Sequence, residues 1–130
     1  ACYFARRPLV SAAVGQFDAY ITTFRAFEKN EKGEPNPSYR CLFPAPPAPG
    51  MAPSCEEAGI LGALTGVVGS LQAMEALKEL LGIGRGLVGR LISYDAREAR
   101  FHEVAYGWDP ENPLNGRNPT IRDLSVHERG

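Results

Sequence analysis

The segment that decides the fold reads SCEEAGILGALTGVVGSLQAMEALKELLG, residues 54–82. Ser54 and Glu57, three positions apart, fit a capping box at a helix N-terminus. Apolar residues then recur at helical spacing as far as Leu81, and Gly82 follows as a C-cap. We therefore predict one long helix that begins at Ser54 and ends at Leu81. Because its first half is apolar nearly all round, we expect that half to be buried.

Glycine is unusually frequent in this helix. Four glycines, at positions 59, 62, 66 and 69, lie on one side of a helical projection. Such a stripe lets another backbone approach closely, but each glycine costs about 1 kcal/mol of helix stability relative to alanine. We expect a break or irregular turn near Gly62 to Gly66, and a regular helix from about Val67 to Leu81.

Four strands are predicted around the helix. Leu9 to Val14 is an apolar, small-residue run suited to a strand buried on both faces, and Phe17 to Phe27 is rich in β-branched and aromatic residues, with Asp18-Ala19 as the turn between them. Leu87 to Tyr94 and Arg100 to Tyr106 predict an antiparallel hairpin. The resulting order differs from the βαβ alternation of a complete nucleotide-binding domain.

Two segments carry no regular pattern. Residues 28–54 hold seven of the eleven prolines, so they are predicted to cross the surface as an extended crossover loop. Residues 107–130 are rich in Pro, Asn and Gly and are predicted to form a polar tail. Ala1 to Arg7 contains no initiator Met and reads like the last turns of a helix, so we expect a longer protein upstream.

Composition narrows the classes of function. The net charge is −1 and the basic residues are scattered, so we expect no nucleic-acid partner. The longest apolar run, Ile60 to Leu81, contains several charged residues, so no membrane span is predicted. Three cysteines at spacings unsuited to a disulfide framework indicate a reducing compartment, and we expect a cytoplasmic protein.

Six stretches of the chain match a known family in order and spacing. They are Pro8-Leu9-Val10-Ser11, Ser38-Tyr39-Arg40-Cys41-Leu42-Phe43-Pro44, Pro53-Ser54-Cys55-Glu56-Glu57-Ala58-Gly59-Ile60-Leu61-Gly62, Gly66 through Lys78, Tyr94-Asp95-Ala96 and Asn118-Pro119-Thr120-Ile121. Together they resemble the C-terminal half of ThiF/MoeB/HesA adenylyltransferases. The resemblance implies an α/β fold in which residues 1–130 form the mostly antiparallel half of a Rossmann-like adenylation domain, with one long helix and a Pro-rich crossover loop.

The resemblance also implies an activity. Family members use ATP and magnesium to adenylate the C-terminal glycine of a ubiquitin-like sulfur-carrier protein ending in Gly-Gly, for molybdopterin or thiamin biosynthesis. We expect the intact protein here to be a homodimer. In family members, the nucleotide is held by a Gly-rich strand-to-helix turn, by Arg and Lys beyond it, and by an Asp upstream of the segment matching Ala1-Cys2. We therefore expect this chain alone to lack the ATP site, to be inactive and to hold no cofactor. The run Gly82-x-Gly84-x-Gly86 lies at a helix C-terminus, where the dipole repels phosphate.

Family members also commonly carry a structural zinc held by two Cys-x-x-Cys pairs. The matching positions here are Ser38 and Cys41, then Asn112 and Asn115. A tetrahedral zinc site needs four Cys or His ligands, and one thiol is left at these positions. The spacing of His102 and His127 does not suggest that they replace the missing ligands. We therefore expect no zinc.

Cys55 is the candidate catalytic residue. It matches the crossover-loop cysteine that some relatives use to form a thioester or acyl-disulfide link with the carrier. The predicted helix N-terminus would lower the pKa of its thiol, whereas Glu56 and Glu57 would raise that pKa. A purely structural role for Cys55, as a small residue at a helix start, stays open. Cys2 and Cys41 are interpreted as packing residues.

Other charged groups are interpreted as solvated surface. Glu75, Lys78 and Glu79 share one helical face, and the predicted hairpin carries Arg97, Glu98, Arg100, His102 and Glu103. Two hypotheses stay open beside the adenylyltransferase. One is a carrier-binding or dimerisation module without catalysis, and the other is a thiol-dependent sulfur carrier centred on Cys55.

Overall fold

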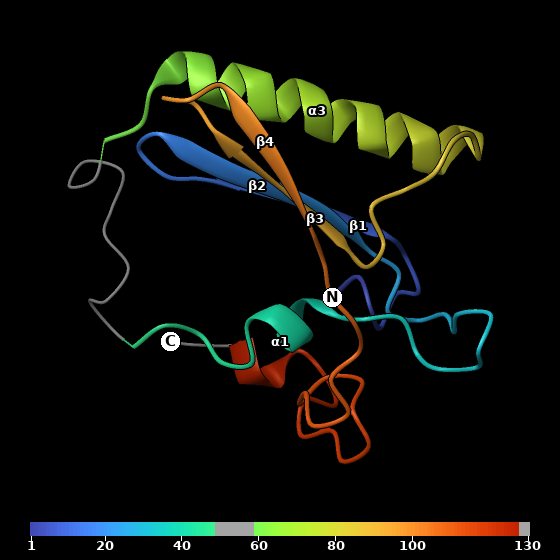
Figure 1. Ribbon diagram of the computed structural model, residues 1–130. Coiled ribbons are helices and arrows are strands. Elements are labelled where there is room, and N and C mark those ends of the chain that lie inside the picture. The colour runs from blue at the N-terminus through green and yellow to red at the C-terminus, as the bar shows by residue number, and fades with distance from the viewer. Residues whose placement is uncertain (49–58, 128–130) are drawn as a thin grey trace.

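The computed structural model describes residues 1–48 and 59–127, and in them an antiparallel sheet lies beneath one long helix (Figure 1). The strands are β1 (Leu9–Val14), β2 (Asp18–Phe24), β3 (Arg90–Asp95) and β4 (Arg100–Ala105), in the spatial order β1-β2-β3-β4. The helices are α1 (Tyr39–Leu42), α3 (Gly62–Leu81) and the 3-10 turn η1 (Ser125–His127). The predicted fold class, an antiparallel α/β arrangement with one long helix, is confirmed.

The first hairpin turns earlier than predicted. The Gly15 N–H donates to the Asp18 carbonyl at 2.7 Å and closes the turn there. Asp18 already belongs to β2, because it pairs with Asp95 of β3, and Ala19 pairs with both Val14 and Tyr94. The predicted turn at Asp18-Ala19 is therefore wrong. The second predicted hairpin is confirmed, with Asp95 opposite Arg100.

Helix α3 begins later than predicted and runs without a break. Gly59 has a φ of +72° and Leu61 is extended, so the helix begins at Gly62 and is continuous through Gly66. The predicted capping box of Ser54 and Glu57 lies outside the described residues. The expected irregular turn is wrong because the cost of these glycines is offset where Leu64 and Val68 pack against the sheet.

The predicted end of α3 is confirmed. Gly82 adopts the left-handed conformation, with φ +64° and ψ +35°, and its N–H donates to the Lys78 carbonyl at 2.9 Å. The following Ile83 N–H donates to the same carbonyl at 3.2 Å. Glycine is needed here because a side chain would be strained at this φ.

Burial of α3 is restricted to a narrow line of residues. Leu64 and Val68 are buried and join Ala19 in the core. Most of the other large apolar side chains on the helix are exposed, namely Val67, Met74, Leu77, Leu80 and Leu81. The expectation that the first half is buried all round is wrong within the described residues, because the sheet covers α3 from one side. β1 is likewise an edge strand of intermediate burial, and it is not buried on both faces.

Strand β2 is covered on both sides. Its odd-numbered residues Ala19 and Ile21 lie on the side of α3, where Ala19 packs against Leu64 and Val68. Its even-numbered Tyr20 and Phe24 point to the opposite side, where they meet aromatic rings of the α1 segment. Figure 1 shows α1 and the C-terminal segment on that opposite side of the sheet. The sheet therefore forms the middle layer.

The predicted polar tail is partly folded. Asn112 is only 1% exposed, and the Trp108 Nε1 donates to the Asn115 carbonyl at 3.1 Å. Residues 107–121 therefore pack as part of the domain, and the prediction of a tail is wrong for them. The polar composition of this segment gave no sign of its burial, because buried polar side chains need hydrogen-bond partners that here are distant in sequence.

Residues 1–7 form the helical turn that the sequence predicts. Arg6 lies in the left-handed region with φ 54°, its N–H donates to the Tyr3 carbonyl, and the Arg7 N–H donates to the Cys2 carbonyl. These two bonds are those of a Schellman helix end. Within the described parts of the chain, we find no helix with the length and apolar character needed to span a bilayer.

Candidate functional site

The predicted catalytic residue, Cys55, lies outside the described residues. The described chain stops at Ala48 on one side of it and resumes at Gly59 on the other. The site can therefore be built from its two flanks: the first part of the crossover segment with α1, and the N-terminus of α3. Figure 1 shows these flanks on opposite sides of the sheet.

The first flank is held by four polar side chains, Ser38, Cys41, Asn112 and Asn115, which we call the loop-root cluster. Ser38 Oγ donates to Asn112 Oδ1 at 3.2 Å, across 74 positions of sequence. The Ser38 N–H donates to Cys41 Sγ at 3.3 Å, and Asn112 Nδ2 donates to Asn115 Oδ1 at 2.8 Å. The structure thus brings together the four positions that the family resemblance matched to zinc ligands.

The donor atoms of the loop-root cluster do not suit zinc. Zinc sites in proteins use thiolate, imidazole or carboxylate ligands, and Cys41 supplies the one such group here. In the described residues, no group of three or more His, Cys, Asp or Glu side chains is placed to hold a metal ion. His102 lies in β4 and His127 in η1, both exposed.

A hollow of about 230 Å³ borders the same flank. Apolar side chains such as Phe4, Leu9 and Phe24 contribute to its wall, and Cys2 lines it as a partly buried free thiol. Its basic lining residues are Arg7, Arg40 and His127. The start of the crossover segment therefore runs beside an apolar hollow with basic side chains in its wall.

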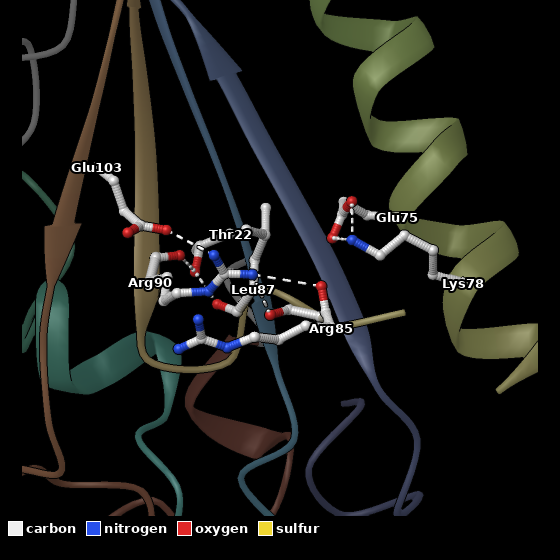
Figure 2. A network of polar contacts seen from close by, with 8 residues as sticks. Thr22, Glu75, Lys78, Arg85, Leu87, Arg90 and Glu103 are labelled. Atoms are coloured by element: carbon white, nitrogen blue, oxygen red, sulfur yellow. Dashed lines mark hydrogen bonds and ion pairs between the residues drawn. The ribbon is translucent and has the colours of Figure 1, made fainter. Parts of the chain in front are cut away.

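A buried polar network fixes the sheet behind this flank (Figure 2). Tyr106 and Thr22 hydroxyls lie 2.6 Å apart, and Thr22 Oγ1 also lies 2.8 Å from the Arg90 carbonyl and 3.1 Å from that of Leu87. Because a hydroxyl has one proton, Tyr106 donates to Thr22, and Thr22 donates to a carbonyl. Burial raises the pKa of the Tyr106 hydroxyl above its usual value.

Arg90 completes this network at the start of β3. Figure 2 shows its guanidinium directed at Glu103 of β4 and at the backbone that precedes β3. It donates to Glu103 Oε1 at 2.6 Å and to the Gly86 carbonyl at 2.8 Å. The charged side chains of the hairpin loop and β4 are otherwise exposed, as predicted.

The acidic and basic residues of α3 form ion pairs. Lys78 pairs with Glu75 at 2.8 Å, the predicted i, i+3 geometry (Figure 2). Glu79 instead pairs with Arg25, which follows β2 and also binds Glu28. Arg25 donates to both Glu28 carboxylate oxygens, and these bonds hold the pKa of that carboxyl below its usual range. Through Arg25, Glu79 ties α3 to Glu28 at the start of the crossover segment, while the Glu75–Lys78 pair stays within the helix. The side chains of Glu75, Lys78 and Glu79 are partly buried, so a fully solvated face is the wrong interpretation for them.

The second flank, α3, presents an open apolar surface. Leu80 is 82% exposed, and Met74 and Leu77 are about half exposed. A Cβ added at Gly62, Gly66 or Gly69 would meet no other atom within 4 Å among the described residues. The glycine stripe is therefore not filled by the described part of this chain.

Sequence reasoning missed several residues that organise the site. Arg25, Thr22 and Tyr106 carried no local signal for these roles, because the contacts that join them to other elements span 54 to 84 positions of sequence. The sequence places Asn112 and Asn115 at zinc-ligand positions of the family, but it does not predict the hydrogen bonds between them. The alignment of their positions with a known ligand set was the signal that could have placed them together.

Comparisons with known proteins agree on one family. The sequence profile of the ThiF family matches residues 1–114. The chain is 50% identical over 122 residues to the sulfur carrier protein adenylyltransferase of Thermus thermophilus, covering 94% of this chain and 44% of that protein. It is 43% identical over 129 residues to the SAMP-activating enzyme E1 of Haloferax volcanii, covering 98% of this chain and 45% of that protein.

Solved structures show the same fold at low sequence identity. The crystal structure of E. coli MccB superposes with a TM-score of 0.65 at 15% identity, over 91% of this chain and 35% of that one. The chain thus spans less than half the length of the relatives it matches.

Proposed function

The chain belongs to the ThiF family, and on that premise we propose that it is the C-terminal part of an ATP-dependent adenylyltransferase that activates a ubiquitin-like sulfur-carrier protein. The observation that carries this proposal is its 50% identity, over 94% of its length, to a sulfur carrier protein adenylyltransferase. The proposed carrier ends in Gly-Gly and serves molybdopterin or thiamin biosynthesis.

In the proposed reaction, a carboxylate oxygen of the carrier's last glycine attacks the α-phosphorus of magnesium-bound ATP. The bond between that phosphorus and the β-phosphate oxygen breaks, pyrophosphate leaves, and the carrier becomes an acyl adenylate. A triphosphate needs free backbone N–H groups and cations at a helix N-terminus. The glycine run after α3 does not offer them, because the Gly82 and Ile83 N–H groups both donate to Lys78. This supports a division of labour in which residues outside the described ones hold ATP.

The role proposed for this chain is that of a scaffold. The exposed apolar side chains and the glycine stripe of α3 suit the docking of another layer of the same enzyme. Together α3 and the sheet would hold the two ends of the crossover segment and so position Cys55. We also propose that the complete protein is a homo-oligomer.

The test is ATP–pyrophosphate exchange by the full-length protein, with a carrier ending in Gly-Gly. We expect carrier-dependent exchange in the wild type and in the Cys55→Ala variant, because adenylation needs no thiol. Sulfur transfer through the carrier should fail in Cys55→Ala if Cys55 forms the covalent link. Cys2→Ala is the matched control, since Cys2 is a free thiol of the described chain, and it should leave both steps intact.

One alternative is favoured by a specific observation. The broad apolar surface of α3 would also suit a carrier-binding or dimerisation module with no catalytic step. In that case the full-length protein would bind the carrier but show no exchange at any carrier concentration. Exchange that depends on the carrier's terminal glycine would eliminate this alternative.

A further inference from the structure

The loop-root cluster joins two segments that are far apart in sequence. Ser38 and Cys41 belong to the crossover segment, while Asn112 and Asn115 belong to the segment after β4. Ser38 is fully buried and Asn112 is 1% exposed, so water cannot replace the bonds between them. Buried polar groups are costly unless each is paired, which makes the pairing within this cluster decisive.

Asn112 is saturated with hydrogen bonds. Its Oδ1 accepts from Ser38 Oγ, from the Leu114 N–H at 2.9 Å and from the Asn115 N–H at 2.9 Å. Its Nδ2 donates to the Asp109 carbonyl at 2.7 Å and to Asn115 Oδ1 at 2.8 Å. Both donor hydrogens and the acceptor oxygen of the amide are in use, so this side chain specifies one geometry.

The bonds also run in one direction through the cluster. Because the Ser38 hydroxyl proton is donated to Asn112, the contact of 3.8 Å between Ser38 Oγ and Cys41 Sγ uses the Cys41 proton. From Asn112 the chain continues to Asn115, whose Nδ2 donates to the carbonyls of Ala26 at 3.3 Å and Asn36 at 2.9 Å.

Cys41 is placed as an acceptor as well. Its Sγ accepts the Ser38 N–H and the Asp109 N–H, each at 3.3 Å. These two backbone donors come from the two segments that the cluster joins. The sulfur thus links the segments through hydrogen bonds, and the amide nitrogens beside it have no lone pair to offer a metal.

We propose that the loop-root cluster is a metal-free replacement for a zinc site. The cluster anchors the start of the crossover segment to the C-terminal segment by hydrogen bonds alone. The stability of the protein is then independent of zinc. It depends instead on the side-chain amides of Asn112 and Asn115. This inference concerns anchoring and stands whether or not the protein activates a carrier.

The first test measures metal content and melting temperature of the full-length protein. Wild-type protein from zinc-supplemented cells should hold far less than one zinc per chain, and a zinc chelator should leave its melting temperature unchanged. Asn112→Ala should lower the melting temperature by about 4–8 °C, because it leaves buried partners unpaired. Asn118→Ala, an exposed asparagine of the same segment, is the control and should have little effect.

A second variant tests whether the four positions have the geometry of a ligand set. Ser38→Cys, Asn112→Cys and Asn115→Cys together place four thiols in the cluster, and this variant should bind about one zinc per chain and become sensitive to the chelator. Stoichiometric zinc in the wild type, or melting of the wild type on chelation, would overturn the proposal. A four-thiol variant that folds but binds no zinc would also overturn it.

Discussion

The two faces of the sheet differ in how completely their side chains are packed within the described chain. On the side of α1, Tyr20 stacks on Phe43, Phe24 meets Tyr39, and the loop-root cluster satisfies its buried polar groups within the described chain. On the side of α3, two buried side chains carry the packing, while most large apolar residues of the helix are exposed. The difference indicates that the described chain pairs its buried polar groups on the α1 side, whereas it leaves most of the apolar surface of α3 open.

Glycine shows the same contrast at the level of single atoms. A Cβ at Gly116, on the α1 side, would collide with the Asn112 carbonyl oxygen and would lie 2.5 Å from that of Pro110. A Cβ at Gly66, on α3, would meet nothing within 4 Å in the described chain. Substitutions to alanine should therefore have opposite signs on the two sides.

The largest effect is expected for Gly116→Ala. Backbone atoms that close to the new Cβ must move, and this should cost about 3 kcal/mol or more of unfolding free energy. Chemical denaturation of the full-length protein measures it. Gly107→Ala, in the same segment and with open space around it, should change the unfolding free energy by less than about 0.5 kcal/mol. Equal effects of the two substitutions would contradict a close-packed α1 side.

A smaller loss is expected for Leu64→Ala. Leu64 is 3% exposed, and its truncation leaves a cavity against Ala19. We expect a loss of about 2 kcal/mol, at the low end of the usual range, because the layer around it is incomplete. Leu80→Ala is the comparison and should change the unfolding free energy of the 130-residue chain by less than about 0.5 kcal/mol. A larger loss for Leu80→Ala in the full-length protein would show that another layer covers it there.

Loss of the Thr22 hydroxyl should cost about 1–2 kcal/mol. Thr22→Val keeps the shape but leaves the Tyr106 hydroxyl without its acceptor. Thr22→Val and Tyr106→Phe should be coupled in a double-mutant cycle, since they remove one shared bond. Additive effects would contradict the hydrogen bond between Thr22 and Tyr106.

The same network predicts a pH dependence. Burial raises the pKa of Tyr106, so the folded protein retains the proton that the unfolded chain loses near the ordinary tyrosine value of about 10. Its contribution is complete below that pH and is lost as the pH rises toward the folded pKa. The melting temperature of the wild type should therefore fall more steeply with pH above about pH 10 than that of Tyr106→Phe. Equal pH dependence of the two melting temperatures would refute this assignment.

The smallest effect is expected for Gly66→Ala, and its sign is informative. In the 130-residue chain this change should stabilise by about 0.5–1 kcal/mol, because alanine favours helix and the Cβ meets no atom. In the full-length protein it should destabilise if another backbone lies against the stripe. Stabilisation in both forms would mean that the stripe is not a packing surface.

The strands were largely predictable, and the helix start was not. Alternation and β-branched content placed β1 and the β3–β4 hairpin within a few residues, since these signals are local. The glycines misled at Gly62, because packing of Leu64 and Val68 against the sheet supports a regular helix from that residue onward. Local propensity also gave no sign that Asn112 would be buried, as its partner Ser38 is 74 residues away.

The candidate site was predictable only in outline. The family resemblance grouped positions 38, 41, 112 and 115, and the structure brings them together, but the hydrogen bonds that join them depend on backbone carbonyls at Ala26, Asn36 and Asp109. No spacing rule encodes those contacts. Cys55 remains a prediction from its place in the sequence.

The central claim is that ATP is bound by residues outside this chain. Equilibrium binding of magnesium ATP by the 130-residue chain, with circular dichroism to verify folding and the full-length protein measured alongside, tests it most directly. The account predicts saturable binding by the full-length protein and none by the chain alone. Binding of comparable affinity by the folded 130-residue chain would contradict it.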